Sequence, residues 1–191
     1  MQGVIWGEKV GIRPLSPFDA GAIRRFMTDP AVVDLLFEEK GGEPPSALLL
    51  ALMIISQGMG ASPDYGIVEK NGTLIGSVRL WRVSERNRSA MLTIFIGEKR
   101  AWGSGYGTDA MRLILRQAFG PMKLHRVELN VFDFNERAIR CYERVGFTRE
   151  GIRREALCRD GRYHDILVMG ILREEFLARE AERFRRGAGE Q

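Results

Sequence analysis

The most constraining feature of this 191-residue sequence is a glycine-rich segment, Gly97–Ala110, which reads GEKRAWGSGYGTDA. It follows a segment typical of a strand, Ala90–Ile96, and precedes a segment with helical periodicity. Glycine lets a backbone approach a ligand without a Cβ in the way. The first turn of a helix adds unpaired N–H groups and the positive end of the helix dipole. The segment therefore predicts a phosphate site, although a glycine cluster alone is also compatible with a flexible surface turn.

Two well-known phosphate loops do not match this segment. A P-loop requires Gly-Lys-Ser/Thr, and no lysine follows these glycines. A dinucleotide fingerprint that began at Gly103 would need a glycine at position 108, where the chain has Thr108. The phosphate would have to belong to another class of ligand.

A second informative segment is Asn135–Phe147, NERAIRCYERVGF. It predicts a helix over Asn135–Val145 that ends at Gly146. Asn135 and Tyr142 are seven residues apart, which places them about 20° apart around a helix. The core face of this helix is expected to carry Ala138, Cys141 and Val145. Two structural alternatives stay open: Asn135 as an N-cap, and Tyr142 as a half-buried core residue.

The remaining sequence alternates between strand and helix patterns. Asn71-Gly72 between two apolar runs predicts a hairpin of Tyr65–Lys70 with Leu74–Trp81. Further elements are expected as strands at Val10–Leu15, Arg126–Phe132, Phe147–Cys158 and Tyr163–Leu172, and as helices at Asp19–Thr28, from Pro44-Pro45 to Gln57, and at Gly105–Phe119. This order predicts one mixed α/β (α+β) domain with a largely antiparallel sheet. We assign the domain to residues 1–172 and a charged helix and tail to residues 173–191.

The two segments carry a specific resemblance. Arg100-x-x-Gly103-x-Gly105 resembles the acyl-CoA pyrophosphate loop of the GNAT (Gcn5-related) N-acetyltransferases. The segment from Asn135 through Tyr142 to Phe147 resembles the second signature of that family. The resemblance extends over about Gly11–Leu172 and looks most like the branch that acetylates ribosomal-protein N-termini and polyamines. It implies a GNAT fold whose sheet splays into a V between Ala90–Ile96 and Arg126–Phe132, with flanking helices.

The resemblance also implies acetyl-CoA as co-substrate and a set of residues that bind it. The pyrophosphate would lie on Arg100 and on the turn formed by Gly103, Gly105, Tyr106 and Gly107. Asn135 would hydrogen-bond the pantetheine arm. A backbone N–H of the Ala90–Ile96 strand would polarise the thioester carbonyl.

Tyr142 has a chemical role in this scheme, because the departing CoA thiolate must be protonated. A thiol has a pKa of about 8.5 and a phenol one of about 10, so a nearby tyrosine can donate the proton. A carboxylate could accept the proton of the attacking amine. Glu128 on the Arg126–Phe132 strand is our candidate for this base, with Glu85 as an alternative. The alternation of that strand leaves open whether Glu128 faces a cavity or solvent.

The sequence indicates the amine acceptor only weakly. Leu36-Phe37-Glu38-Glu39 and Glu43 resemble the acidic region of polyamine acetyltransferases, although a solvated loop is an equal alternative. Trp81 and Tyr163 could line an acceptor pocket. The acceptor is expected to be a ribosomal-protein N-terminus, a polyamine or a small drug amine. A non-catalytic acyl-CoA-binding GNAT module is the alternative function, and Tyr142 argues against it.

Composition excludes several other partners. The net charge of +4 is spread among acidic residues, and no zinc spacing or long basic arm points to direct nucleic-acid binding. His125 and His164 are too isolated for a metal site, so no metal is expected. The longest apolar run, Ala47–Ile55, is too short to cross a bilayer, so no membrane partner is expected.

Weaker sequence features indicate the compartment and the oligomeric state. The N-terminus lacks the layout of a signal peptide, and Cys141 and Cys158 make no disulfide framework, so a cytoplasmic protein is expected. The tail helix carries Phe176, Leu177 and Phe184, which could pack on their own domain or on a partner. A homodimer is the habit of the family.

Overall fold

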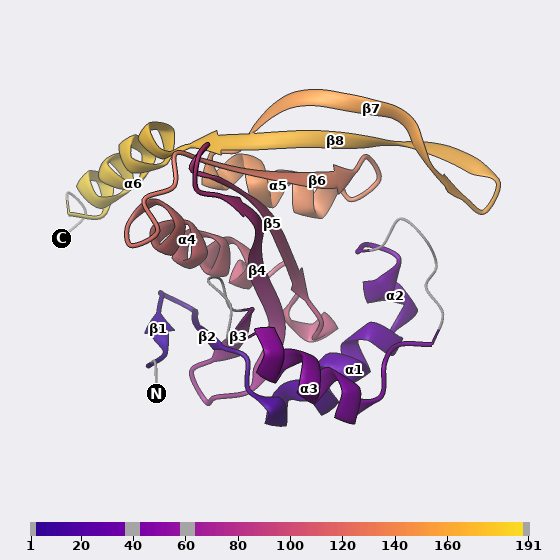
Figure 1. Ribbon diagram of the computed structural model, residues 1–191. Helices are drawn as coiled ribbons and strands as arrows, with labels where there is room; N and C mark the ends of the chain where they lie inside the picture. Colours follow the sequence, from indigo (N-terminus) through magenta and orange to yellow (C-terminus); the bar gives the residue numbers. More distant parts are fainter. Residues whose placement is uncertain (1–2, 37–42, 58–63, 189–191) are drawn as a thin grey trace. The chain divides into compact units, whose positions relative to one another are not determined.

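The computed structural model describes residues 3–36, 43–57 and 64–188. They form two compact units, Met1–Trp81 with Leu92–Ile114 and Arg82–Met91 with Leu115–Gln191, and each is described by itself. The sheet has the strand order β1-β2-β3-β4-β5-β6-β8-β7 (Figure 1). The elements in chain order are β1 (Ile5–Trp6), β2 (Val10–Pro14), η1 (Pro17–Asp19), α1 (Ala20–Thr28), α2 (Pro30–Val33), α3 (Ala47–Gln57), β3 (Tyr65–Glu69), β4 (Leu74–Ser84), β5 (Ser89–Ile96), η2 (Lys99–Ala101), α4 (Tyr106–Phe119), β6 (Arg126–Phe132), α5 (Glu136–Val145), β7 (Thr148–Arg159), β8 (Arg162–Leu172) and α6 (Arg173–Ala188).

The first unit contains an antiparallel meander of β1, β2, β3 and the first part of β4. The hairpin between β3 and β4 forms where the sequence predicts it. Gly72 adopts a left-handed φ of 87°, and the Asn71 side chain accepts a hydrogen bond of 3.0 Å from the Thr73 amide. This turn chemistry fixes the register of the two strands.

Helices α1 and α3 contribute to the core of the first unit. The buried face of α1 carries Ala20, Ile23 and Phe26, and Phe26 meets Phe95 of β5 edge to face at 6.2 Å between ring centroids. Leu50 is the buried residue that α3 adds to this cluster. Helix α3 therefore carries more apolar side chains than the core of this unit buries, because Leu48 and Leu52 are exposed.

The second unit is built on β6, β8 and β7, which pair antiparallel, and on a short parallel pairing of Ser89–Met91 with Arg126–Glu128. The turn between β7 and β8 uses two left-handed residues, Asp160 and Gly161. Helix α6 packs on the end of α4 through Phe176, whose ring lies 5.4 Å from that of Phe119. The tail helix thus packs on its own unit, whereas Leu177 and Phe184 stay exposed.

Most predicted elements agree with the structure within two residues at either end. Helix α2 was not predicted: it begins at Pro30, where the sequence analysis ends the preceding helix, and the Asp29 side chain caps it. The predicted core face of α5 is wrong in part, because Ile139, Tyr142 and Val145 are buried while Cys141 is only half-buried. The V-shaped splay and the single domain over residues 1–172 stay predictions.

Candidate active site

Hydrogen bonds hold the glycine-rich turn where the chain comes out of β5. The amides of Gly97 and Glu98 donate to the Ile75 carbonyl, at 2.8 and 3.1 Å, and the Trp102 indole N–H donates to the Ile96 carbonyl at 2.7 Å. These bonds anchor the chain on both sides of η2. The turn is therefore attached to the sheet before it enters α4.

The turn itself requires glycine at two positions. Gly103 and Gly105 have left-handed φ values of 76° and 82°, a region that L-residues with a side chain rarely adopt. No atom lies within 4 Å of the position that a Cβ would take at Gly103. Helix α4 begins next to them at Tyr106, so its first-turn N–H groups have no intrahelical acceptor. An open, glycine-lined helix N-terminus of this kind fits a pyrophosphate.

Arg100, the predicted phosphate-binding cation, belongs to η2 and is 56% exposed. Its guanidinium makes a bidentate pair with Glu69 at the end of β3, at 2.8 and 2.6 Å. The hydrogen bonds to Glu69 raise the pKa of Arg100, and those from Arg100 lower the pKa of Glu69. A phosphate bound at Arg100 would therefore have to share the guanidinium with the Glu69 carboxylate. The sequence did not predict this ion pair.

The start of α4 is also held by the turn between β1 and β2. The buried Asp109 carboxylate accepts hydrogen bonds from the amides of Lys9 and Val10, at 2.7 and 3.0 Å. The Lys9 ammonium reaches back to the Ser104 carbonyl at 2.7 Å. A Cβ at Gly7 would lie 2.5 Å from an Asp109 carboxylate oxygen. The sequence did not predict this contact between the β1–β2 turn and α4. The signal that could have found it is Asp109 itself, an acidic residue in the first turn of a helix.

Asn135, the predicted pantetheine residue, lies in the second unit as the N-cap of α5. Its side-chain oxygen accepts a hydrogen bond of 3.3 Å from the Ala138 amide. The N-cap alternative is therefore confirmed. The oxygen of the Asn135 side-chain amide forms the cap. The nitrogen of the same side-chain amide has two N–H groups, which are not part of the cap.

Tyr142, the predicted proton donor, is buried on the core face of α5, with 8% of its surface exposed. Its ring lies 6.0 Å from the Phe147 ring, and its carbonyl accepts from the Gly146 and Phe147 amides. Gly146 ends the helix with a left-handed φ of 120°. Burial raises the pKa of Tyr142 well above its usual range, so the phenol keeps its proton at neutral pH.

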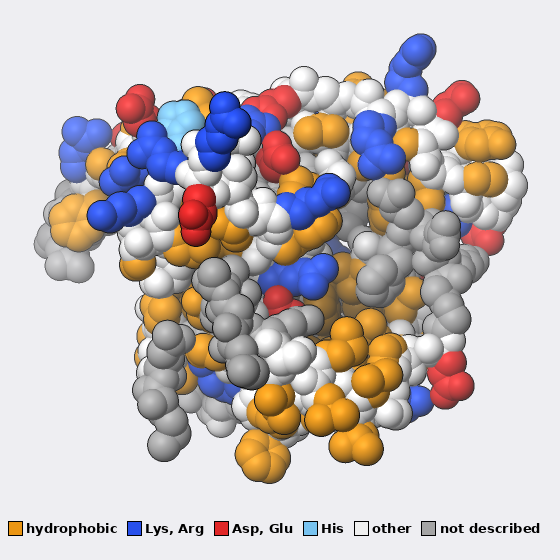
Figure 2. Space-filling model, in the orientation of Figure 1, with side chains coloured by type: hydrophobic (Ala, Val, Ile, Leu, Met, Phe, Trp, Pro, Cys, Tyr) orange, Lys and Arg blue, Asp and Glu red, His pale blue; other side chains and the backbone are white. Residues whose placement is uncertain are grey.

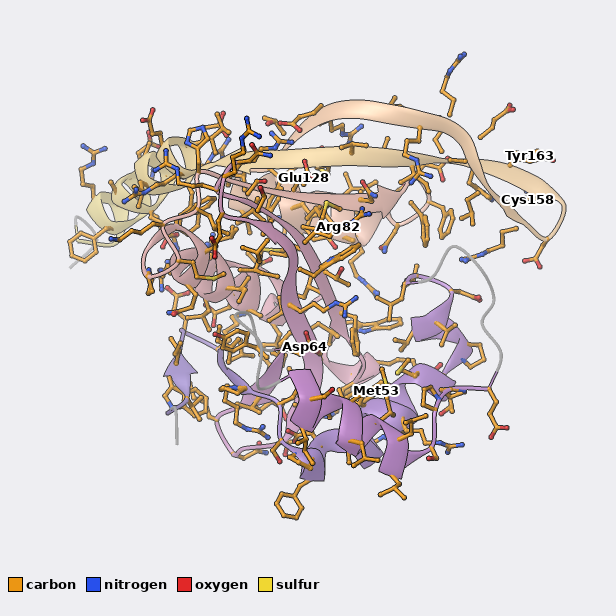
Figure 3. The ribbon with its side chains drawn as sticks, viewed as in Figure 1. Met53, Asp64, Arg82, Glu128, Cys158 and Tyr163 are labelled. Carbon is orange, nitrogen blue, oxygen red and sulfur yellow. The ribbon has the colours of Figure 1, made fainter. Side chains whose placement is uncertain are left out.

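Glu128, the predicted base, lies on the half-buried face of β6 (Figure 3). It pairs with Arg126 at 3.0 Å, and the same guanidinium also binds Glu150 of β7. These contacts raise the pKa of Arg126, and the hydrogen bonds that Arg126 donates to Glu150 contribute most. The alternative base Glu85 is exposed in the turn between β4 and β5.

The two aromatic residues predicted to line an acceptor pocket, Trp81 and Tyr163, belong to different units. The Trp81 indole donates to the Thr93 hydroxyl at 3.0 Å in the first unit. Tyr163 is 67% exposed and pairs with Cys158 across the hairpin of the second unit (Figure 3). Asp64, which sequence analysis did not single out, is half-buried at the start of β3 (Figure 3); burial raises its pKa, and Arg79 partly offsets this shift.

The predicted acidic region lies mostly outside the described residues, since Phe37, Glu38 and Glu39 belong to the undescribed segment 37–42. Glu43 pairs with Arg24 at 3.2 Å. Within the described ranges, no group of His, Cys, Asp and Glu could hold a metal ion.

A family model described as an acetyltransferase (GNAT) domain matches residues 9–148. The chain belongs to the GNAT acetyltransferase family. The predicted family and fold class are therefore confirmed, and acetyl-CoA is the co-substrate of that family. The turn, which is open at Gly103, is the part of this structure that fits its pyrophosphate, whereas the Lys9 ammonium lies 3.2 Å from the Cβ position of Gly105.

Several relatives are known by name. A spermidine N(1)-acetyltransferase of Vibrio cholerae is 34% identical over 119 residues, which are 62% of this chain and 68% of that protein. A Bacillus subtilis protein with a provisional ribosomal N-acetyltransferase name is 32% identical over 106 residues, 56% of this chain and 57% of that protein. The matched part of a further Bacillus subtilis relative is 55% of its length. The chain thus spans about half to two thirds of the length of these relatives.

A solved structure gives a longer match. The crystal structure of a Vibrio cholerae spermidine N-acetyltransferase in complex with CoA and spermine superposes with a TM-score of 0.79 at 25% identity. The match covers 88% of this chain and 98% of that chain. Among the helices of the described residues, none is long and apolar enough to span a bilayer.

Proposed function

We propose that this protein is an N-acetyltransferase that moves the acetyl group of acetyl-CoA to a primary amine. The observation that carries the proposal is the turn with left-handed Gly103 and Gly105, which opens α4 next to Arg100. It occurs in a chain that belongs to an acetyltransferase family. When bound, acetyl-CoA supplies an acetyl thioester, which a neutral amine can attack.

Two sets of residues are assigned to the donor. Arg100 and the backbone of Gly103, Gly105, Tyr106 and Gly107 bind the pyrophosphate through charge-assisted and helix N-terminal hydrogen bonds. The Asn135 amide nitrogen donates to the pantetheine arm. The Arg100 side chain is 56% exposed, so its guanidinium is accessible to a phosphate, although it would then share that guanidinium with Glu69, whose side chain is 12% exposed.

Tyr142 supplies the proton for the leaving thiolate. As the C–N bond forms and the C–S bond breaks, the amine nitrogen loses a proton and the sulfur gains one. The phenol is neutral before this step, which is the state that a donor needs, although burial raises its pKa and so makes it a weaker acid. Glu128, directly or through water, accepts the proton of the amine, and Arg126 holds that carboxylate in place.

The acceptor is a primary amine from one of the classes named for the relatives, a polyamine or a protein N-terminus. A non-catalytic acyl-CoA-binding module is the second candidate function, and the retained Tyr142 argues against it.

We further propose a cytoplasmic homodimer that binds neither nucleic acid nor membrane. Neither Cys141 nor Cys158 forms a disulfide in the described structure, as expected in a reducing compartment. Hydrophobic side chains gather over α3 in Figure 2, and Leu48, Leu52 and Ile55 of that helix are each more than half exposed. This face supports self-association, which sedimentation velocity of the protein and of Leu52→Glu would test.

The experiment that tests the proposed function measures CoA thiol release from acetyl-CoA with a panel of amines. The panel contains spermidine, ribosomal-protein N-terminal peptides and an aminoglycoside. The proposal predicts release that depends on both the amine and the enzyme, with an acetylated amine detected by mass. Binding of acetyl-CoA without transfer to any amine would instead support the non-catalytic module.

A further inference from the structure

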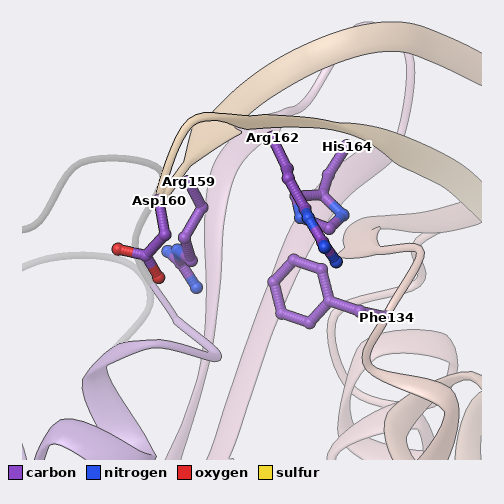
Figure 4. A pocket seen from close by; sticks show the side chains of 5 residues that line it. All are labelled: Phe134, Arg159, Asp160, Arg162 and His164. Atoms are coloured by element: carbon purple, nitrogen blue, oxygen red, sulfur yellow. The ribbon is translucent and has the colours of Figure 1, made fainter.

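The end of the β7–β8 hairpin in the second unit forms a pocket of about 480 Å³. Five side chains line it: Phe134, Arg159, Asp160, Arg162 and His164 (Figure 4). Arg159, Arg162 and His164 extend from the hairpin toward the side on which Phe134 lies, whereas the Asp160 carboxylate lies away from Phe134. The pocket therefore combines two guanidinium groups and an imidazole with one aromatic ring.

The turn places the two arginines directly opposite each other. Arg159 and Arg162 are Cα partners in the β7–β8 register. Asp160 and Gly161 between them have left-handed φ values of 49° and 77°, the signature of a tight two-residue hairpin turn. Like charges directly opposite on neighbouring strands destabilise a sheet. The Asp160 carboxylate of the same turn places one negative charge beside them, and an anion bound between the two guanidinium groups would further reduce their repulsion.

Aromatic contacts hold Arg159 and His164 in position. The Phe134 ring stacks on Phe132 at 5.3 Å, and the Arg159 guanidinium lies 5.4 Å from the centroids of both rings. The His164 ring meets Phe134 edge to face at 4.8 Å, and its Nδ1 lies 3.3 Å from an Asp133 oxygen. Arg159 and His164 are therefore positioned before any ligand arrives, which favours binding because fewer side chains must be ordered.

We propose that this pocket binds an oxyanion, carboxylate or phosphate, that is carried by the amine acceptor. This inference rests on the proposed function. Phe134 directly precedes Asn135, the residue proposed to bind pantetheine, so the pocket adjoins the start of α5. Two guanidinium groups match an oxyanion and repel a polycation. The preferred acceptor is then an amine with an acidic group, such as an acidic peptide, and not spermidine.

The test compares two peptides that differ only in charge, Ala-Gly-Asp-Glu and Ala-Gly-Asn-Gln. We expect kcat/KM for the acidic peptide to exceed that for the neutral one by at least about tenfold, the change expected of one charged contact. Arg162→Gln should remove most of this preference while it leaves the rate with the neutral peptide unchanged. Arg154→Gln is the matched control, because Arg154 lies on the paired strand β7, is exposed and does not line the pocket.

Binding of the acidic peptide in the absence of acetyl-CoA, measured by calorimetry, separates this inference from the proposed function. If no amine is acetylated but Arg162→Gln still weakens peptide binding, the proposed function is wrong and the anion site stands. Equal rates with both peptides, or a preference that survives Arg162→Gln, would overturn the anion site. So would an Arg162→Gln variant that binds acetyl-CoA more weakly but acetyl-dephospho-CoA as well as wild type, because the oxyanion would then be the 3′-phosphate of the donor.

Discussion

Arg100 and Glu69 form a bidentate ion pair that joins the glycine-rich turn to the end of β3, with N–O distances of 2.8 and 2.6 Å. The guanidinium is thereby oriented before a phosphate arrives, and it is also partly neutralised. The Arg100 side chain is 56% exposed, whereas that of Glu69 is 12% exposed. The guanidinium is therefore accessible to a pyrophosphate, which would compete with Glu69 for it.

Substitutions of the two partners should act in opposite directions on donor binding. Arg100→Gln should raise the Kd for acetyl-CoA about tenfold, since it removes a charge-assisted hydrogen bond. Glu69→Gln should lower that Kd by up to about fivefold, because no carboxylate then competes for the guanidinium. Calorimetric titration with acetyl-CoA at two salt concentrations measures both effects. A weaker affinity in Glu69→Gln would show that Glu69 positions Arg100 more than it competes for it.

Gly7 and Asp109 should couple the N-terminal hairpin to the donor site. Gly7→Ala places a Cβ 2.5 Å from the buried Asp109 carboxylate, so that carboxylate must move from the Lys9 and Val10 amides. We expect a loss of about 1–3 kcal/mol in the free energy of unfolding, together with weaker acetyl-CoA binding. Gly3→Ala is the matched control, because no atom lies within 4 Å of its added Cβ. Denaturant unfolding of both variants checks this, and equal losses would refute the coupling.

Asn135 should have separable structural and binding roles. Asn135→Ala loses the N-cap of α5 and should cost about 0.5–2 kcal/mol of stability. Asn135→Asp keeps a capping oxygen but removes the amide N–H donors, so it should unfold like wild type and still raise KM for acetyl-CoA several-fold. Thermal unfolding and steady-state kinetics on the two variants distinguish the roles. A normal KM in Asn135→Asp would leave Asn135 as a cap alone.

The half-buried carboxyl of Asp64 should make stability depend on pH. Burial raises its pKa in the folded protein above the unfolded value, so the folded state becomes relatively less stable as the pH rises through the unfolded pKa of about 4. Asp64→Asn should therefore be more stable than wild type at pH 7 and equally stable near pH 3. Urea unfolding at both pH values measures the difference. A variant that is less stable at pH 7 would show that the attraction to Arg79 outweighs burial.

Local sequence signals predicted most of the fold. Asn71-Gly72 marked the hairpin of β3 and β4, and the helical periodicity of Gly105–Phe119 marked α4. These features succeed because turn conformations and helix periodicity are encoded by neighbouring residues. The order of the segments then matched a known family.

The contacts that could not be predicted are those between residues far apart in the chain. Asp109 binds amides at positions 9 and 10, Arg100 pairs with Glu69, and Arg126 pairs with Glu150. A single sequence does not show which strands become neighbours, so such partners cannot be chosen from spacing. The core face of α5 was misplaced for a related reason: Tyr142 can be buried or exposed until its tertiary neighbours are known.

The central claim is that Tyr142 protonates the leaving thiolate in acetyl transfer. The most direct test measures kcat and the Kd for acetyl-CoA in Tyr142→Phe, which keeps the ring that packs near Phe147 and removes only the hydroxyl. We predict a fall in kcat of about 10²-fold or more, as for the loss of a general acid, with the Kd unchanged within about twofold. An unchanged kcat would contradict the claim and leave Tyr142 as a core residue of α5.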